Sequence, residues 1–116
     1  MSEDTTPVLI GAGQLVQRDV DPQAALAPVA MMAEAARRAA ADSGAGARLL
    51  TQVDLLAVVN VIGWQYRNAP RLLAELLDAD PVANFYTTIG GNTPQWLVNE
   101  TAARIAAGEV RLALIA

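Results

Sequence analysis

The sequence predicts an α/β fold in which strands and helices alternate around a mainly parallel sheet. Four short apolar runs are separated by three stretches with helical periodicity, which gives the order βαβαβαβ. The second run, residues 53–61, is nearly continuous in Val, Leu and Ala, as is typical of a parallel strand that is covered on both faces. Parallel strands of this kind are joined by right-handed crossovers. The length of 116 residues corresponds to one domain at most.

The helices have recognisable first and last residues. The first is expected over residues 28–42, because Pro28 suits a first turn and Ser43-Gly44 ends the periodicity. The second begins at Pro70, with Asn68 as its cap, and ends at Asp80-Pro81; the third covers residues 94–107 and is closed by Gly108. The residues expected to face the core are Val29, Met32, Ala33, Ala36 and Ala40 in the first helix, Leu72, Leu73, Leu76 and Leu77 in the second, and Leu97, Val98, Ala102 and Ile105 in the third.

The strands are expected at residues 8–12, 53–61, 84–89 and 110–116. Gly11 and Gly13 follow the first of them and suggest a dinucleotide-binding turn. The third glycine of that motif is replaced by Val16, and no helix follows directly, so the motif fails. A tight turn at the end of a strand is the better interpretation of these glycines.

The composition excludes several kinds of chemistry. The chain has no Cys and no His, and all eight basic residues are Arg, so thiolate catalysis, imidazole bases, disulfides, ordinary zinc sites and Schiff bases have no residues here. The carboxylates do not converge by spacing, and we expect no metal site or cofactor. A net charge of −4 argues against nucleic-acid binding and against anchoring to an anionic membrane. The acidic N-terminus lacks a signal-peptide pattern, and no apolar run reaches a membrane span, so we expect a cytoplasmic protein.

A glycine-rich turn is the strongest functional signal in the chain. Gly90 and Gly91 allow a backbone to come close to a ligand, and Asn92 or Thr93 can cap the helix whose first turn holds Pro94. The amino end of a helix presents free N–H groups and roughly half a positive charge, which stabilises an anion or a polarised carbonyl oxygen. This turn contains no nucleophilic side chain at the glycines.

An aromatic stretch is the second candidate. Trp64, Tyr66 and Arg67 follow the second strand, at the carboxyl end of the sheet where α/β proteins usually bind ligands. Substrate binding is one interpretation, with Arg67 meeting a phosphate. Loop packing or an interface is the alternative.

The chain resembles the amino-terminal half-domain of a thiolase, most closely the sterol-carrier-protein-type thiolases and thiolase-like acetyl-CoA acetyltransferases. The resemblance is carried by Thr6 to Gln14, by residues 53–59 and by the stretch from Gly91 to Ala116. It implies a sheet of order 3-2-1-4, with strand five and the second half-domain outside residues 1–116. It therefore implies that this chain is the N-terminal part of a longer protein.

The resemblance also implies a function. Thiolases act as acyltransferases on CoA thioesters in lipid metabolism and carry their acyl-accepting Cys at the position of Gly91, so ordinary covalent thiolysis is not expected here. Asn92 and the backbone N–H groups of residues 91–93 remain to bind a thioester carbonyl. The alternatives are a non-catalytic CoA-thioester binder or partner subunit, and a retro-aldol lyase. The resemblance further suggests a homodimer through the third strand, with a monomer as the other possibility.

Overall fold

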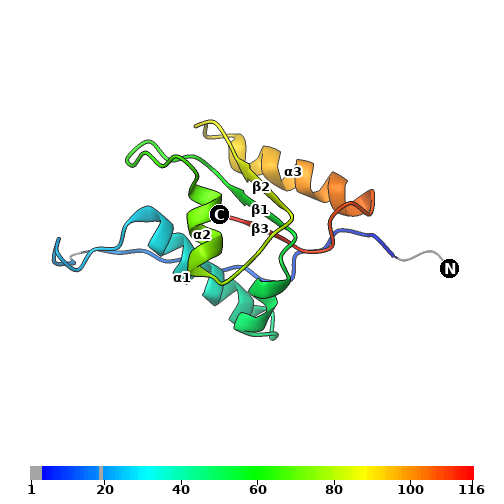
Figure 1. Cartoon of the computed structure of the whole chain (residues 1–116), viewed down its shortest axis with the longest axis horizontal. Coiled ribbons are helices and arrows are strands. Elements are labelled where there is room, and N and C mark those ends of the chain that lie inside the picture. The colour runs from blue at the N-terminus through cyan, green and yellow to red at the C-terminus, as the bar shows by residue number, and fades with distance from the viewer. Residues whose placement is uncertain (1–3, 19) are drawn as a thin grey trace.

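The chain folds around a short parallel sheet with helices on both faces (Figure 1). The computed structural model describes residues 4–18 and 20–116. Their helices are α1 (Pro28–Asp42), α2 (Ala69–Leu76) and α3 (Thr93–Ala106), with a 3-10 helix η1 (Ala47–Gln52), and their strands are β1 (Leu55–Val58), β2 (Ala83–Tyr86) and β3 (Ala113–Ile115). None of the helices in this described part is long and apolar enough to cross a membrane.

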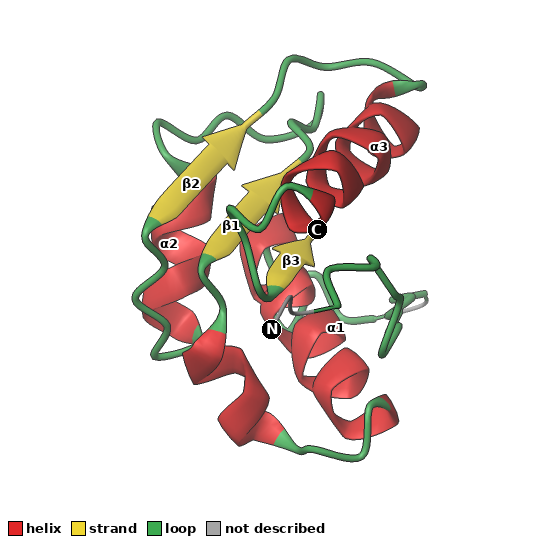
Figure 2. Cartoon of the chain, turned by 90° about the vertical axis from the view of Figure 1, so that its right-hand side faces the viewer, coloured by secondary structure: helices red, strands yellow, loops and turns green. Residues whose placement is uncertain are grey.

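β1 is the central strand of the sheet. The strand order is β2-β1-β3, and both pairings are parallel, with Leu55 opposite Ala83 on one side and Ala113 on the other. All four residues of β1 are buried. Leu56 and Val58 belong to the core formed with α1, η1 and α2, whereas α3 lies on the opposite face (Figure 2). The α/β class and the parallel sheet predicted from the sequence are confirmed.

The first expected strand is the main correction to the predicted topology. Residues 8–12 form no strand, and the expected order 3-2-1-4 becomes a three-stranded sheet in which the second and fourth predicted strands pair directly. Because β2 and β3 occupy both edges of β1, no edge of the central strand is left for residues 8–12. This segment packs against α1 instead, where the Ala12 N–H donates to the Asp42 carboxylate at 2.9 Å.

Close packing against α1, and not a turn, explains Gly11 and Gly13. A Cβ at Gly11 would collide with the carbonyl oxygen of Ala39, and one at Gly13 would collide with that of Ala35. The Arg38 guanidinium also donates to the Gln14 carbonyl at 3.0 Å. The N-terminal segment is therefore held by helix contacts that strand patterning does not predict.

The three helices lie close to their predicted positions. α1 has the predicted bounds and buries Ala33, Ala36 and Ala40. α2 begins after Asn68, whose side chain accepts a hydrogen bond from the Arg71 N–H at 3.2 Å, so the predicted cap is confirmed. The predicted inward face of α2 is only half right. Leu73 and Leu77 are buried, while Leu72 and Leu76 are 40% and 45% exposed.

Asp54 joins the two ends of the fold in a way that was not predicted. Its carboxylate accepts hydrogen bonds from the backbone N–H groups of Arg111 and Leu112, both at 2.8 Å. Its own N–H donates to the Leu112 carbonyl, and its carbonyl accepts from the Ala83 N–H, both at 3.0 Å. A single residue before β1 thus aligns the starts of β2 and β3.

Candidate functional site

The two candidate stretches lie in loops that leave the same edge of the sheet. The aromatic loop (residues 59–68) follows β1, and the glycine loop (residues 87–92) follows β2. Because β1 and β2 are parallel neighbours, both loops begin at the carboxyl edge of the sheet (Figure 1). This is the edge at which ligands of α/β proteins usually bind.

In the glycine loop, the two glycines have different surroundings. The Gly90 carbonyl accepts a hydrogen bond from the Thr93 N–H at 3.2 Å, which closes a tight turn before α3. A Cβ at Gly90 would lie 2.7 Å from the Thr93 hydroxyl oxygen, so this position is crowded. Nothing lies within 4 Å of a Cβ at Gly91. The missing side chain at Gly91 therefore leaves open space just before the helix.

Asn92 stands at the N-cap position of α3, but its side chain makes no capping hydrogen bond. Of the two caps that the sequence offers, Asn92 therefore holds the position without the side-chain bond, and Thr93 is the first residue of the helix. Pro94 at the second helical position has no N–H that a cap could accept. The Asn92 carbonyl accepts from the Trp96 N–H at 3.1 Å, which starts the helical ladder. The exposed carboxamide of Asn92 thus remains available to a ligand.

The aromatic loop is partly ordered by its own side chains. Trp64 and Tyr66 stack with ring centroids 6.1 Å apart, and Trp64 is half exposed. The Tyr66 hydroxyl accepts a hydrogen bond from the Val29 N–H at 3.1 Å, in the first turn of α1. Tyr66 therefore supports α1, which favours loop packing over substrate contact for its hydroxyl. Arg67 is exposed and has no ionic partner in the described part of the chain.

Three polar residues that the sequence did not mark as site residues connect these loops. The Tyr86 hydroxyl donates to Asn60 Oδ1 at 2.9 Å, and the Asn60 N–H donates to the Thr87 hydroxyl oxygen at 3.2 Å. Thr87 is buried, and its hydroxyl donates onward to the Thr88 carbonyl at 2.9 Å. The available signal was a polar residue near the end of each strand, Asn60 two residues after β1 and Thr87 directly after β2, because such residues meet at the edge of a parallel sheet.

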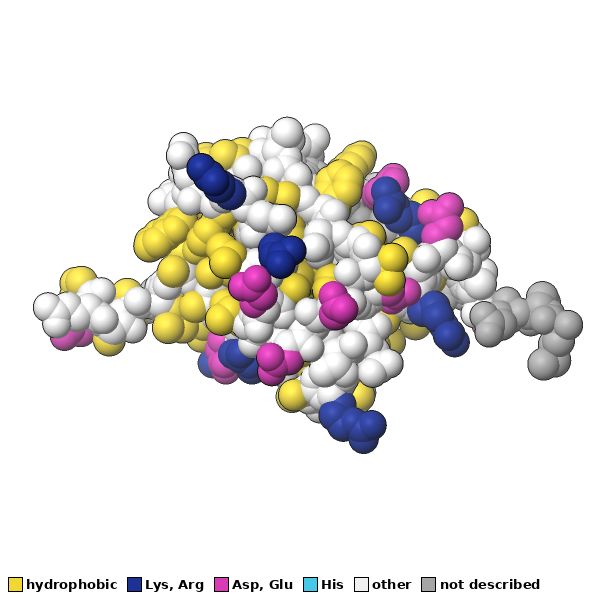
Figure 3. All heavy atoms as spheres, viewed as in Figure 1, with side chains coloured by type: hydrophobic (Ala, Val, Ile, Leu, Met, Phe, Trp, Pro, Cys, Tyr) yellow, Lys and Arg dark blue, Asp and Glu magenta, His cyan; other side chains and the backbone are white. Residues whose placement is uncertain are grey.

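The electrostatics around this edge are mild. The ion pairs of the described residues join neighbouring turns of one helix, as Arg71 and Glu75 do at 3.4 Å, and they are largely exposed. Charged side chains of both signs are interspersed on the face seen in Figure 3. Within residues 4–18 and 20–116, no group of His, Cys, Asp and Glu side chains is placed to hold a metal ion. Charge alone therefore selects no ligand at this site.

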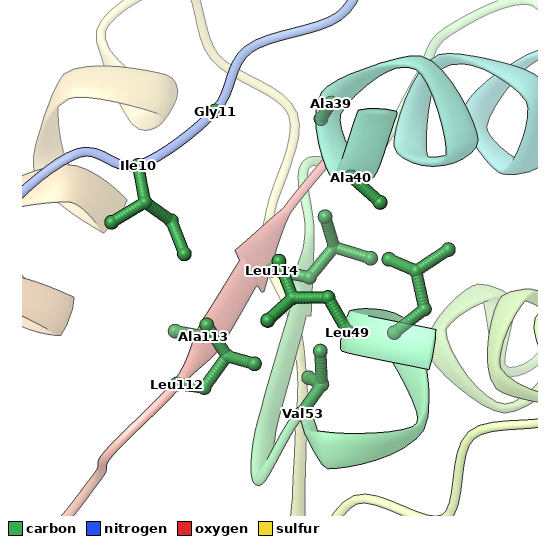
Figure 4. A pocket seen from close by; sticks show the side chains of 10 residues that line it. Ile10, Gly11, Ala39, Ala40, Leu49, Val53, Leu112, Ala113 and Leu114 are labelled. Carbon is green, nitrogen blue, oxygen red and sulfur yellow. The ribbon is translucent and has the colours of Figure 1, made fainter. Parts of the chain in front are cut away.

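Two hollows lie elsewhere in the fold. A small apolar cavity of about 50 Å³ sits below the N-terminal segment, between Ile10, Ala40, Leu49 and Leu114 (Figure 4). A larger open groove of about 750 Å³ runs between residues 4–11, α3 and β3. At its rim, hydrogen bonds from Thr6 lower the pKa of the exposed Asp4 carboxyl. Neither hollow is lined by a predicted site residue, so the candidate site lies apart from both of them.

Several solved structures match this chain, and one of them shows what it is similar to. A monomeric SCP2-thiolase like protein type 1 from Mycobacterium smegmatis, solved by crystallography, is similar to this chain with 34% sequence identity and a TM-score of 0.81. The match covers 96% of this chain and 23% of that chain, so this chain spans less than a quarter of the similar protein. No protein-family model matches the chain, and no curated protein matches it. The resemblance to a thiolase half-domain that the sequence predicts is thereby confirmed.

Proposed function

We propose that this chain, which has the fold of a thiolase-like half-domain, belongs to a protein that binds or transforms acyl-CoA thioesters. The observation that carries the proposal is the 34% identity to an SCP2-thiolase like protein over nearly all of the chain. The open carboxyl edge of the sheet, with the glycine loop and the aromatic loop, is the proposed thioester site. We also propose that residues 1–116 form the N-terminal part of a longer protein that acts in the cytoplasm.

The proposed chemistry excludes a covalent acyl-enzyme on the glycine loop. The thiolase resemblance places the acyl-accepting Cys at Gly91, where this chain has no side chain at all. Asn92, through its carboxamide, and the N–H groups at the start of α3 are suited to hold a thioester carbonyl oxygen by hydrogen bonds. Gly90 and Thr93 shape the turn, and we propose that Trp64 and Arg67 in the aromatic loop contact the nucleotide end of CoA.

The first alternative is a binder or partner subunit that performs no chemistry. It is favoured by the absence of Cys and His from this chain, because these residues supply the nucleophile and general base in most acyl transfer. The second alternative is a retro-aldol lyase, whose acid and base residues would come from outside residues 1–116. Both alternatives keep the same CoA-thioester site and differ only in whether the bound thioester is then cleaved.

Mass spectrometry of the full-length protein tests the absence of covalent catalysis. After incubation with acetyl-CoA, we expect no added acetyl mass on the wild type. Gly91→Cys should gain one acetyl group, because a thiol there has free space and the helix start favours its anion. Gly63→Cys is the matched control, since its Cβ also has open space but lies in the aromatic loop. Acetylation of the wild type at residues 87–98 would refute the proposal.

We further propose that two copies associate through β2, as the thiolase resemblance suggests; the alternative is a monomer. β2 is an edge strand, and Val82 beside it is 93% exposed. Charged residues on an edge strand oppose strand pairing between copies. Asn84→Lys should therefore turn a dimer into a monomer in sedimentation velocity. A wild-type protein that sediments as a monomer at all concentrations, like the monomeric similar protein, would contradict this part of the proposal.

A further inference from the structure

The two loops of the candidate site are joined by one set of hydrogen bonds, which we call the Asn60 bridge (Tyr86, Asn60 and Thr87). Tyr86 is the last residue of β2, and Asn60 lies two residues after β1. The bridge contains the 2.9 Å bond from the Tyr86 hydroxyl to Asn60 Oδ1 and the 3.2 Å bond from the Asn60 N–H to the Thr87 hydroxyl oxygen. It therefore fixes the first residues of both loops against each other.

No other hydrogen bond links these loops within the described residues. The neighbouring bond from the Thr87 N–H to the Val58 carbonyl, at 3.1 Å, continues the strand ladder and stops before the aromatic loop. Beyond the bridge, residues 61–68 and 89–92 have no hydrogen bond in common. Of the hydrogen bonds between described residues, the bridge is thus the link that reaches from the glycine-loop side into the aromatic loop.

The side chains of the bridge have fixed orientations, so the bridge can restrict the motion of both loops. The Thr87 side chain is 7% exposed, and its hydroxyl uses both its acceptor and its donor capacity, so its orientation is fixed. The Tyr86 ring is rigid and only partly buried, and its hydroxyl makes the bond that holds the Asn60 side chain among the described residues. Polar networks whose members hydrogen-bond to one another rigidify the segments that they join, and here the buried Thr87 anchors the two partly buried residues.

We propose that Tyr86 and Asn60 are positioning residues, which hold the aromatic loop and the glycine loop as one binding edge for the CoA thioester. This inference rests on the proposed function for its ligand. Neither residue needs to touch the thioester. Their role is to reduce the ordering cost that two independent loops would add to binding.

The test uses the full-length protein and compares Tyr86→Phe, Asn60→Ala and the double variant. By calorimetric titration with acetyl-CoA, each single variant should bind about fivefold more weakly, as expected for the loss of one hydrogen bond. The double variant should be no weaker than either single variant, because both changes break the same link. Losses that multiply, or wild-type affinity in Tyr86→Phe, would overturn the proposal.

Hydrogen exchange separates the bridge from the proposed function. Without ligand, Tyr86→Phe should speed exchange in both residues 60–68 and residues 87–92, whereas Asn60→Asp, which keeps the acceptor, should leave both slow. Thr51→Val removes a hydroxyl bond to the Arg48 carbonyl before β1 and serves as the control that changes neither loop. A wild type without acetyl-CoA affinity would refute the proposed function only. Unchanged exchange in Tyr86→Phe would refute the bridge.

Discussion

At the scale of single residues, the two glycines before α3 differ in how much space a side chain would have at each position. Gly90 is crowded by the Thr93 hydroxyl, so its lack of a side chain has a steric reason. Gly91 faces open space and has no such reason. Packing therefore does not explain the glycine at the position where a thiolase nucleophile is expected.

The close packing of Gly11 against α1 leads to a prediction about the stability of the protein. Gly11→Ala should lower the free energy of unfolding by about 2 kcal/mol, because overpacking against a helix backbone that cannot move away strains both segments. Chemical denaturation measures the change. Gly63→Ala is the control, since its Cβ meets nothing within 4 Å, and it should stay close to the wild type. Equal stabilities for the two variants would show that the N-terminal segment does not pack on α1.

At the scale of elements, two asparagines precede helices and only one acts as a side-chain cap. Asn68 accepts from the Arg71 N–H, whereas the Asn92 side chain makes no capping bond. Asn68→Ala should therefore destabilise the protein by about 1 kcal/mol. Asn92→Ala, the matched substitution, should leave the denaturation midpoint unchanged. A loss of stability in Asn92→Ala equal to that in Asn68→Ala would mean that Asn92 caps α3 in solution.

A substitution at Asp54 tests how much the carboxylate of this residue stabilises the start of β3. Asp54→Asn replaces one acceptor oxygen with an amide nitrogen that faces a backbone N–H of residues 111–112. The loss should be about 2 kcal/mol, as for other hydrogen bonds to a charged group. Asp80→Asn makes the same charge change at an exposed position and should have little effect. Faster hydrogen exchange at residues 113–116 in Asp54→Asn alone would locate the change.

Local signals explain which elements the sequence could predict. The bounds of α1 follow from Pro28 and Ser43-Gly44, which act within one turn. Residues 8–12 have the composition of a strand, but a strand also needs a free edge, and β3 occupies the one that they were expected to use. η1 was not predicted, since a short 3-10 helix has no long apolar period. Predictions therefore failed where a distant partner decides the structure.

The candidate site divides in the same way. The position of Gly91 before the third helix follows from sequence, because the glycines, Asn92 and Pro94 lie within a few residues of one another. The Asn60 bridge joins residues 26 and 27 positions apart, so it depends on the register of β1 and β2. The hydrogen bond from the Val29 N–H to the Tyr66 hydroxyl joins residues 37 positions apart, so the sequence pattern could not predict it either.

At the scale of the whole molecule, the proposed site and the apolar groove lie in different places. The groove beside α3 and β3 contains none of the site residues, which lie in the loops after β1 and β2. The described residues thus offer one wall of the proposed thioester site. The strand pairing of β1 with β2 and the Asn60 bridge hold the two loops of this site in position.

Ligand binding to the folded state must raise the stability of the entire molecule, which gives the broadest test of the proposed function. At a CoA concentration roughly a hundred times Kd, the free energy of unfolding of the full-length protein should rise by about 2.7 kcal/mol. The melting temperature measures this rise. ATP at the same concentration carries similar phosphates without the pantetheine arm, and it should shift the melting temperature much less. An equal shift with ATP would indicate general anion binding, and no shift with CoA would remove the thioester from the proposed function.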